Sequence, residues 1–209
     1  MKARRLIALI LIGLIVSSCA VMSEEECIYS DWNAVGYEDG AEGRSSDRFG
    51  DYRRACADHS ITPDFQAWQN GREQGLVEYC QPSRGFQVGQ SGSTYSGVCN
   101  SNLEADFLDA YRLGIELYSL RSNLNAAMSQ LNSNERTLQR IDEDINEIEV
   151  LIISDGTTAL ERVRLLAEMK DLSELSGELK LEAELLIEAR TIAELELTDF
   201  EMSLVQAGF

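Results

Sequence analysis

The fold is decided by residues 117–152, which read LYSLRSNLNAAMSQLNSNERTLQRIDEDINEIEVLI. Leucine or isoleucine recurs there every seven residues, and a second, mostly apolar row lies three residues after each of them. The first row is Leu117, Leu124, Leu131, Leu138, Ile145 and Ile152, and the second is Leu120, Ala127, Asn134, Ile141 and Ile148. Such heptads place both rows on one face of a helix and are typical of a coiled coil.

A second heptad run follows the break at Ser154-Asp155-Gly156-Thr157. Its rows contain Leu165, Leu172, Leu179 and Leu186, interleaved with Met169, Ser176, Ala183 and Leu197, and Arg190 interrupts the second row. Two long helices joined by a turn at 154–158 predict an antiparallel coiled-coil hairpin over residues 101–209. The alternative is a parallel dimer in which the second helix continues the first.

Both long helices begin with a capping-box pattern, Ser101 with Glu104 and Thr158 with Glu161. Folding about Gly156 places Asn134 near Gly177 and Glu178 and predicts a weak, polar waist in the hairpin.

A loose unit recurs upstream, between Cys27 and about residue 118. Its copies read WNAVGYEDG at 32–40, AWQNGREQG at 67–75, GFQVG at 85–89 and AYRLG at 110–114. The first three carry glycines four residues apart, which share one helix face and let another backbone approach closely. The spacers of the first two are mostly polar, so we expect short, tightly packed soluble helices and not a membrane-helix dimer.

Two local signals refine this half of the chain. Asp64 after Pro63 predicts a helix start. Residues 85–97 lack the Gly-Lys-Ser/Thr of a phosphate-binding loop, and we interpret them as a Ser/Gly/Tyr-rich loop closed by Cys99.

Four cysteines frame this half, Cys27, Cys56, Cys80 and Cys99. Their even number favours disulfides in an exported protein, and the absence of CxxC spacing argues against the alternative, a zinc site. Four cysteines allow three connectivities. We favour Cys27–Cys56 with Cys80–Cys99, because each pair brackets one glycine-rich unit.

The N-terminus has the form of a secretory signal. Basic residues precede an apolar run at 6–16, which is too short to span a bilayer core of about 30 Å. Val16-Ser17-Ser18-Cys19 then resembles the lipobox of bacterial lipoproteins. The resemblance implies that residues 1–18 are removed and that Cys19 carries diacylglycerol and acyl lipid. Residues 19–26 would form a tether, and Ala20 implies sorting to the outer membrane, facing the periplasm.

Charge limits the possible partners. Removal of residues 1–18 leaves 15 basic and 36 acidic residues, a net charge of −21. So acidic a chain repels nucleic acid and anionic lipid headgroups. We therefore expect no nucleic-acid partner, and we expect the lipid at Cys19 to hold the protein at the membrane.

The order of residues in the cysteine-framed half resembles DUF2799, a family of uncharacterised proteobacterial lipoproteins. The matching positions are Cys27, Asp31-Trp32, Gly36, Asp39-Gly40, Gly43, Arg48, Tyr52, Cys56, Gly71, Gly75, Tyr79-Cys80, Gly85-Phe86, Gly89, Ser91-Gly92, Tyr95, Val98-Cys99, Phe107, Ala110-Tyr111, Gly114 and Tyr118. The resemblance implies a domain over residues 27–118 and transfers no catalytic residue, because the family carries no known activity.

The sequence contains few candidates for catalytic or metal-binding residues. The only histidine, His59, lies between Asp58 and Ser60, and adjacent residues cannot converge as a catalytic triad does. We expect no enzyme, no metal site and no cofactor besides the lipid. Six residues could line a binding groove or equally form polar ties within the base: Trp32, Tyr37, Asp39, Arg72, Glu73 and Tyr95.

Together these patterns predict a mainly α protein, in which a small, disulfide-stapled, Gly/aromatic-rich helical base is followed by a long antiparallel coiled-coil hairpin. We expect a structural or adaptor protein of the cell envelope, whose arm contacts an envelope protein partner or self-associates. Leu151-Ile152-Ile153 at the tip either docks a partner or seals the coil. The alternative is a module whose base binds cell-wall glycan or peptide, with the coil as spacer.

Overall fold

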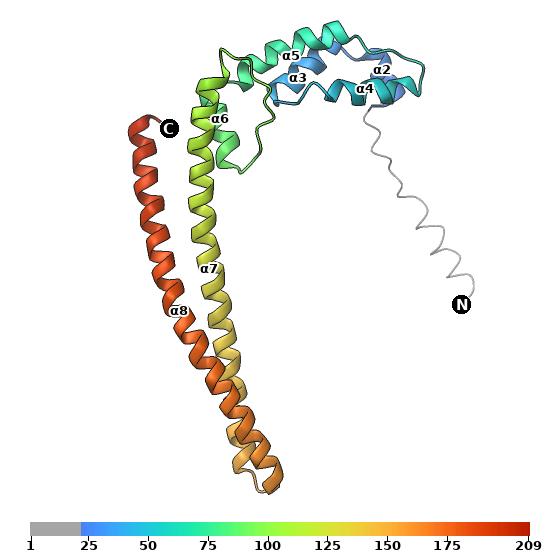
Figure 1. Ribbon diagram of the computed structural model, residues 1–209. Helices are drawn as coiled ribbons and strands as arrows, with labels where there is room; N and C mark the ends of the chain where they lie inside the picture. The colour runs from blue at the N-terminus through green and yellow to red at the C-terminus, as the bar shows by residue number, and fades with distance from the viewer. Residues whose placement is uncertain (1–21) are drawn as a thin grey trace, which may run out of the picture. The chain divides into compact units, whose positions relative to one another are not determined.

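The computed structural model describes residues 22–209, and within this range the regular structure is helical, with no strand (Figure 1). The helices are α2 (Glu24–Tyr29), α3 (Trp32–Ala41), α4 (Arg48–Ala57), α5 (Phe65–Tyr79), α6 (Pro82–Gln90), α7 (Glu104–Ile153) and α8 (Ala159–Ala207). The signal segment and Cys19 lie outside the described residues. The mainly α fold predicted from the sequence is thus confirmed.

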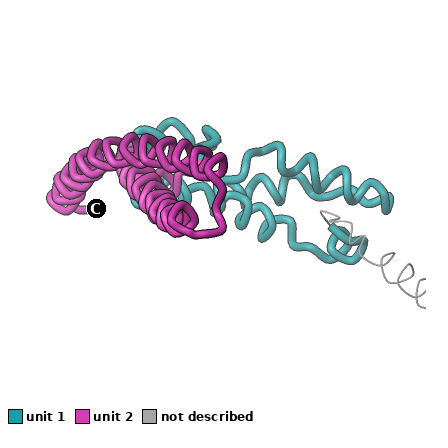
Figure 2. Tube along the Cα trace, turned by 90° about the horizontal axis from the view of Figure 1, so that it is seen from below, with its two compact units in different colours: residues 1–85, 94–110 teal, residues 86–93, 111–209 magenta. Residues whose placement is uncertain are grey.

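The described residues form two compact units (Figure 2). The first contains residues 22–85 and 94–110, and the second contains residues 86–93 and 111–209. This division differs from the expected domains at 27–118 and 101–209, because it groups residues 86–93 with the hairpin.

Side-chain caps start helices α3 and α5 of the first unit. The Asp31 carboxylate accepts from the backbone N–H groups of Asn33 and Ala34 at the start of α3. Asp64 accepts from Ala67 N–H at 3.0 Å and starts α5, as Pro63-Asp64 predicts. These acceptors satisfy N–H groups that the first turn of a helix leaves without a partner.

The core of the first unit is aromatic and contains a disulfide. Trp32 of α3, Phe49 and Tyr52 of α4, and Trp68 of α5 are all buried. The ring of Phe49 lies 6.4 Å from that of Trp32 and 5.1 Å from that of Trp68, so α4 ties the two neighbouring helices together.

The disulfides join Cys27 to Cys56 and Cys80 to Cys99, which is the pairing favoured from the sequence. The first closes a loop that contains α3 and most of α4, and the second closes a loop that contains α6. Loop closures of this size stabilise a fold by about 3–4 kcal/mol each in the chain-entropy model.

Helices α3 and α5 pack at glycine faces, side by side (Figure 1). A Cβ on Gly36 would overlap the carbonyl oxygen of Trp68, and a Cβ on Gly71 would overlap that of Asn33. Gly40 and Gly75 are equally close to backbone atoms of the other helix. The tightly packed soluble helices predicted from the GxxxG spacing are therefore confirmed.

The same contacts occur a second time in the chain. Gly36, Gly40 and Gly43 lie against the Trp68 carbonyl, the Arg72 carbonyl and the Tyr79 ring; Gly85, Gly89 and Gly92 lie against the Phe107 carbonyl, the Tyr111 carbonyl and the Tyr118 ring. The glycines have the same spacing in both sets, and Gly43 and Gly92 share a left-handed φ of 72° and 71°. The recurring unit is thus a pair of helices present twice, and not four single copies.

This repeat corrects the expected loop at 85–97. Residues 85–90 belong to helix α6, and the loop begins only at Ser91. The helix forms because Gly85 and Gly89 let its backbone lie directly against that of α7, a contact that no local propensity reveals.

The long helices α7 and α8 form the antiparallel hairpin predicted from the heptads, which excludes the continuous second helix of the parallel-dimer alternative (Figure 1). Thr158 accepts from Glu161 N–H at 3.3 Å and starts α8 as expected. The prediction of a capping box at Ser101 is wrong. Helix α7 starts at Glu104, whose carboxylate instead accepts a hydrogen bond from the Tyr95 hydroxyl at 3.0 Å.

Every heptad position of the two helices is buried or half-buried. The most buried are Leu117, Ala127, Leu131, Ile141 and Ile148 of α7, with Ser176, Ala193 and Leu204 of α8. Near the C-terminal end of α8, Glu201 pairs with Arg121 of α7 at 2.8 Å, and the Phe209 ring lies 4.9 Å from that of Phe86 in α6. The heptad rows therefore form the seam of the hairpin.

Candidate functional site

Asp39 is the centre of the polar residues singled out in the sequence. Its carboxylate is 6 % exposed and accepts hydrogen bonds from the Trp68 indole N–H at 2.8 Å and the Tyr52 hydroxyl at 3.0 Å. Arg48 donates in turn to the Tyr52 hydroxyl at 3.2 Å and lies over its ring. Because Trp32 is also buried, Trp32 and Asp39 belong to the interior of the base and line no groove.

Two arginines, Arg48 and Arg72, balance the negative charge of the buried Asp39 carboxylate. Arg72 lies over the Trp68 ring and donates to the Arg44 carbonyl through Nε and Nη2. Burial lowers the pKa of Arg72 from its usual value, and the negative charge of Asp39 opposes that shift. Burial raises the pKa of the Tyr52 hydroxyl, which keeps it a neutral donor to Asp39.

The remaining candidate residues also make internal contacts. A hydrogen bond to Glu78 of α5 raises the pKa of the Tyr37 hydroxyl on α3. Glu73 accepts from the Gln69 side chain one helical turn earlier, at 3.2 Å. Tyr95 donates to Glu104 and accepts from the Cys99 backbone N–H at 2.9 Å. Five of the six residues thus make polar contacts within the chain, whereas Trp32 makes ring contacts in the core.

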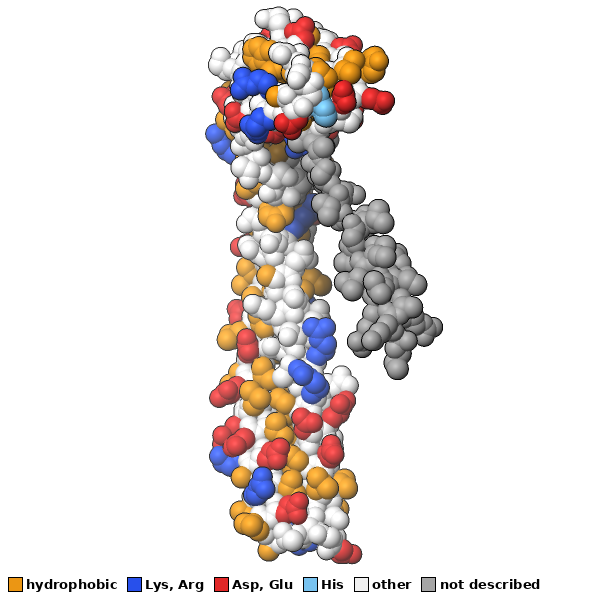
Figure 3. Space-filling view, turned by 90° about the vertical axis from the view of Figure 1, so that its right-hand side faces the viewer, with side chains coloured by type: hydrophobic (Ala, Val, Ile, Leu, Met, Phe, Trp, Pro, Cys, Tyr) orange, Lys and Arg blue, Asp and Glu red, His pale blue; other side chains and the backbone are white. Residues whose placement is uncertain are grey.

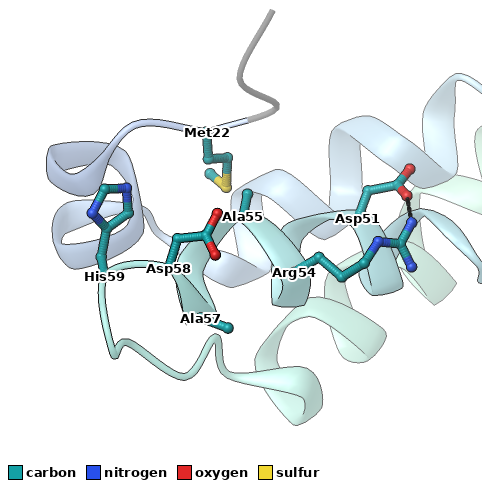
Figure 4. Close-up of a pocket in the computed structure, with 7 residues that line it drawn as sticks. All are labelled: Met22, Asp51, Arg54, Ala55, Ala57, Asp58 and His59. Carbon is teal, nitrogen blue, oxygen red and sulfur yellow. Dashed lines mark hydrogen bonds and ion pairs between the residues drawn. The ribbon is translucent and has the colours of Figure 1, made fainter. Parts of the chain in front are cut away.

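A shallow hollow of about 680 Å³ lies beside α4 (Figure 4). It is lined by Met22, Asp51, Arg54, Ala55, Ala57, Asp58 and His59. The Arg54 guanidinium reaches back along the helix to pair with Asp51, while His59 Nδ1 lies 3.9 Å from a Glu24 carboxylate oxygen. The histidine therefore faces a carboxylate. Among the described residues no cluster of His, Cys, Asp or Glu is arranged to hold a metal ion.

The clearest candidate surface is the apolar tip of the hairpin, defined as Val150, Leu151, Ile153, Leu160 and Val163. Each of these side chains is exposed, up to 79 % at Ile153 and 75 % at Leu160. Orange side chains are visible at this lower end of the hairpin in Figure 3.

A groove of about 490 Å³ beside the tip is lined by Asn146, Glu149, Val150, Ile152, Ile153, Leu166 and Met169. Ile152 is half-buried and contributes to the seam, whereas Leu151 and Ile153 are exposed. The sequence pattern predicts residues 151–153 at the tip but does not place Leu160 and Val163 there. Their signal was present, because both are apolar residues outside the heptad rows.

The fold defines a class of protein: a disulfide-stapled helical base that continues into a long helical hairpin. Residues 31–116 match the family model described as "Protein of unknown function (DUF2799)", and this match supports the assignment of that stretch to the family. Comparisons with curated proteins and with solved structures gave no match. No helix among residues 22–209 is long and apolar enough to cross a membrane.

Proposed function

We propose that this protein is a lipid-anchored adaptor of the bacterial cell envelope, held in the outer membrane through Cys19 and facing the periplasm. The hairpin is the arm that contacts an envelope protein partner. The lipobox resemblance supports the placement, and the four cysteines, paired in two disulfides, agree with an oxidising compartment.

The apolar tip is the observation that carries the adaptor role. Helix α7 has 50 residues and is about 75 Å long at 1.5 Å per residue, and most of it belongs to the arm. Exposed Ile153, Leu160 and Val163 do not contribute to the seam of the hairpin, and exposed apolar clusters are typical of interaction sites. A rigid arm that ends in such a surface is suited to contacting a second protein.

Photo-crosslinking in cells tests this proposal. A crosslinkable residue at Ile153 should capture a discrete envelope protein, because the side chain is 79 % exposed at the tip. The matched control is Gln139, which is exposed on α7 away from the tip and should not capture that protein.

Capture of nothing from Ile153, together with capture of glycan or peptide from the base, would overturn the adaptor role in favour of a cell-wall-binding module. The burial of Trp32 and Asp39 counts against that alternative, because neither side chain is free to bind a ligand.

A further inference from the structure

Helix α8 has a second apolar stripe on the face opposite the seam of the hairpin. It consists of Leu181, Leu185, Ile192, Leu195 and Met202, which are 66, 68, 50, 62 and 53 % exposed. Their spacing of three, four and seven residues places them on one helix face. We call this set the outer stripe. The heptad residues of the same segment, such as Ala193 and Leu204, are buried on the other face.

The outer stripe is longer than an incidental patch. Leu181 and Met202 are 21 positions apart, or about 32 Å along the helix. That length matches a partner helix of about 20 residues. A helix that is apolar on two faces normally packs against neighbours on both, and the hairpin supplies only one of them.

The charges around the outer stripe are mostly negative. Residues 180–205 contain seven acidic side chains and two basic ones, Lys180 at the start of the outer stripe and Arg190. Arg190 lies in the heptad row and pairs with Glu194 at 3.4 Å, so it does not offset the charge of the outer face. The acidic residues on or beside the outer stripe are Glu182, Glu184, Glu188, Glu196 and Asp199.

We propose that the outer stripe of α8 docks a cationic amphipathic helix of a partner protein. Apolar residues of that helix cover Leu185 and Ile192, and its flanking Lys or Arg residues lie opposite carboxylates such as Glu184 and Glu188. A second copy of the same face is a poor occupant, because its own carboxylates would oppose these at close range. This surface is separate from the apolar tip and does not depend on the adaptor role.

Peptide binding to the purified mature chain tests the docking. The probe is a fluorescent 21-residue helical peptide with leucine on one face and lysine on both flanks; its companion carries glutamate in place of every lysine. We expect the lysine peptide to bind the wild-type chain. The double substitution Leu185→Gln with Ile192→Gln should raise the dissociation constant of that peptide at least tenfold. Glutamine keeps good helix propensity, so the exposed sites stay helical.

The matched control is Ile187→Gln with Val205→Gln, which removes two exposed apolar residues from the same helix outside both the outer stripe and the apolar tip. This control should leave the dissociation constant of the lysine peptide within about twofold of the wild-type value. Glu184→Lys with Glu188→Lys should weaken binding of the lysine peptide and strengthen binding of the glutamate peptide. Equal binding to wild type and the Leu185/Ile192 variant would reduce the interaction to charge alone and overturn the proposal. So would a dimer in sedimentation that the same variant abolishes, because the occupant would then be a second copy.

Discussion

Gly71 is the point at which α5 comes closest to α3. A Cβ there would overlap the carbonyl oxygen of Asn33, a backbone atom that cannot move aside without shifting its helix. We expect Gly71→Ala to lower the free energy of unfolding of the base by about 1–3 kcal/mol or more, as overpacking does. Tryptophan fluorescence during urea unfolding measures this selectively, because both tryptophans lie in the base.

Gly50 of α4 supplies the control for Gly71. A Cβ on Gly50 would meet only the end of the Arg54 side chain, at 3.6 Å, so Gly50→Ala should be neutral or stabilising by up to about 1 kcal/mol. Equal losses from both substitutions would mean that helical glycine itself, and not the close approach to Asn33, determines the stability of this base.

Asp39 should be the most sensitive polar residue of the base. Asp39→Ala leaves two buried donors, the Trp68 indole N–H and the Tyr52 hydroxyl, without their acceptor. Each unsatisfied donor costs about 1–3 kcal/mol, so we expect the two together to lower the free energy of unfolding by about 2–6 kcal/mol in urea. Asp39→Asn keeps one acceptor oxygen and should lose less. Exposed Asp58→Ala is the control, and a loss there as large as at Asp39→Ala would contradict the role of this network.

At the scale of elements, the hairpin could be predicted and the base only in part. The heptad rows repeat inside one continuous helix, so Leu117 and Leu131 mark the seam without any knowledge of the rest of the chain. The repeat in the base is hidden because its two halves are separated unequally: Gly36 and Trp68 are 32 positions apart, whereas Gly85 and Phe107 are 22 apart.

The start of helix α7 and the burial of the polar residues in the base depend on side-chain contacts between residues that are distant in the sequence. Glu104 fits a capping box by its spacing, yet its carboxylate is bound by Tyr95 from the preceding loop. The Asp39 network likewise joins residues 13 and 29 positions away, so no local pattern indicates which of Trp32, Asp39 or Arg72 is buried.

Asn134 tests the packing of the hairpin as an element. Its side-chain nitrogen is buried and has no hydrogen-bond partner among the described residues, and on α8 the most buried polar residue is Ser176. Asn134→Leu should raise the free energy of unfolding by about 1–3 kcal/mol, because it removes an unsatisfied buried donor and extends the apolar seam. Far-ultraviolet circular dichroism during urea unfolding measures the change.

Asn132→Leu is the control for this substitution, since Asn132 is exposed on the same helix and should gain nothing. A loss of stability in Asn134→Leu would show that the amide is satisfied in solution and that the polar residue strengthens the hairpin.

At the scale of the whole molecule, charge and attachment must be considered together. With 15 basic and 36 acidic residues after position 18, the chain has a strong negative charge, and the described helices offer no membrane span. A protein held by charge leaves the membrane when salt screens it, since the Debye length falls to about 3 Å at 1 M salt. A protein held by several acyl chains does not.

We therefore expect the wild-type protein to stay in the membrane fraction through a wash at about 1 M salt, and Cys19→Ser to appear in the soluble periplasmic fraction. Ser18→Ala is the matched control: it keeps a small residue before the cysteine and should fractionate like wild type. Release of the wild type by salt would assign attachment to charge. Membrane retention of Cys19→Ser would assign it to a part of the protein other than the lipid, and either result would refute the anchor on which the proposed function depends.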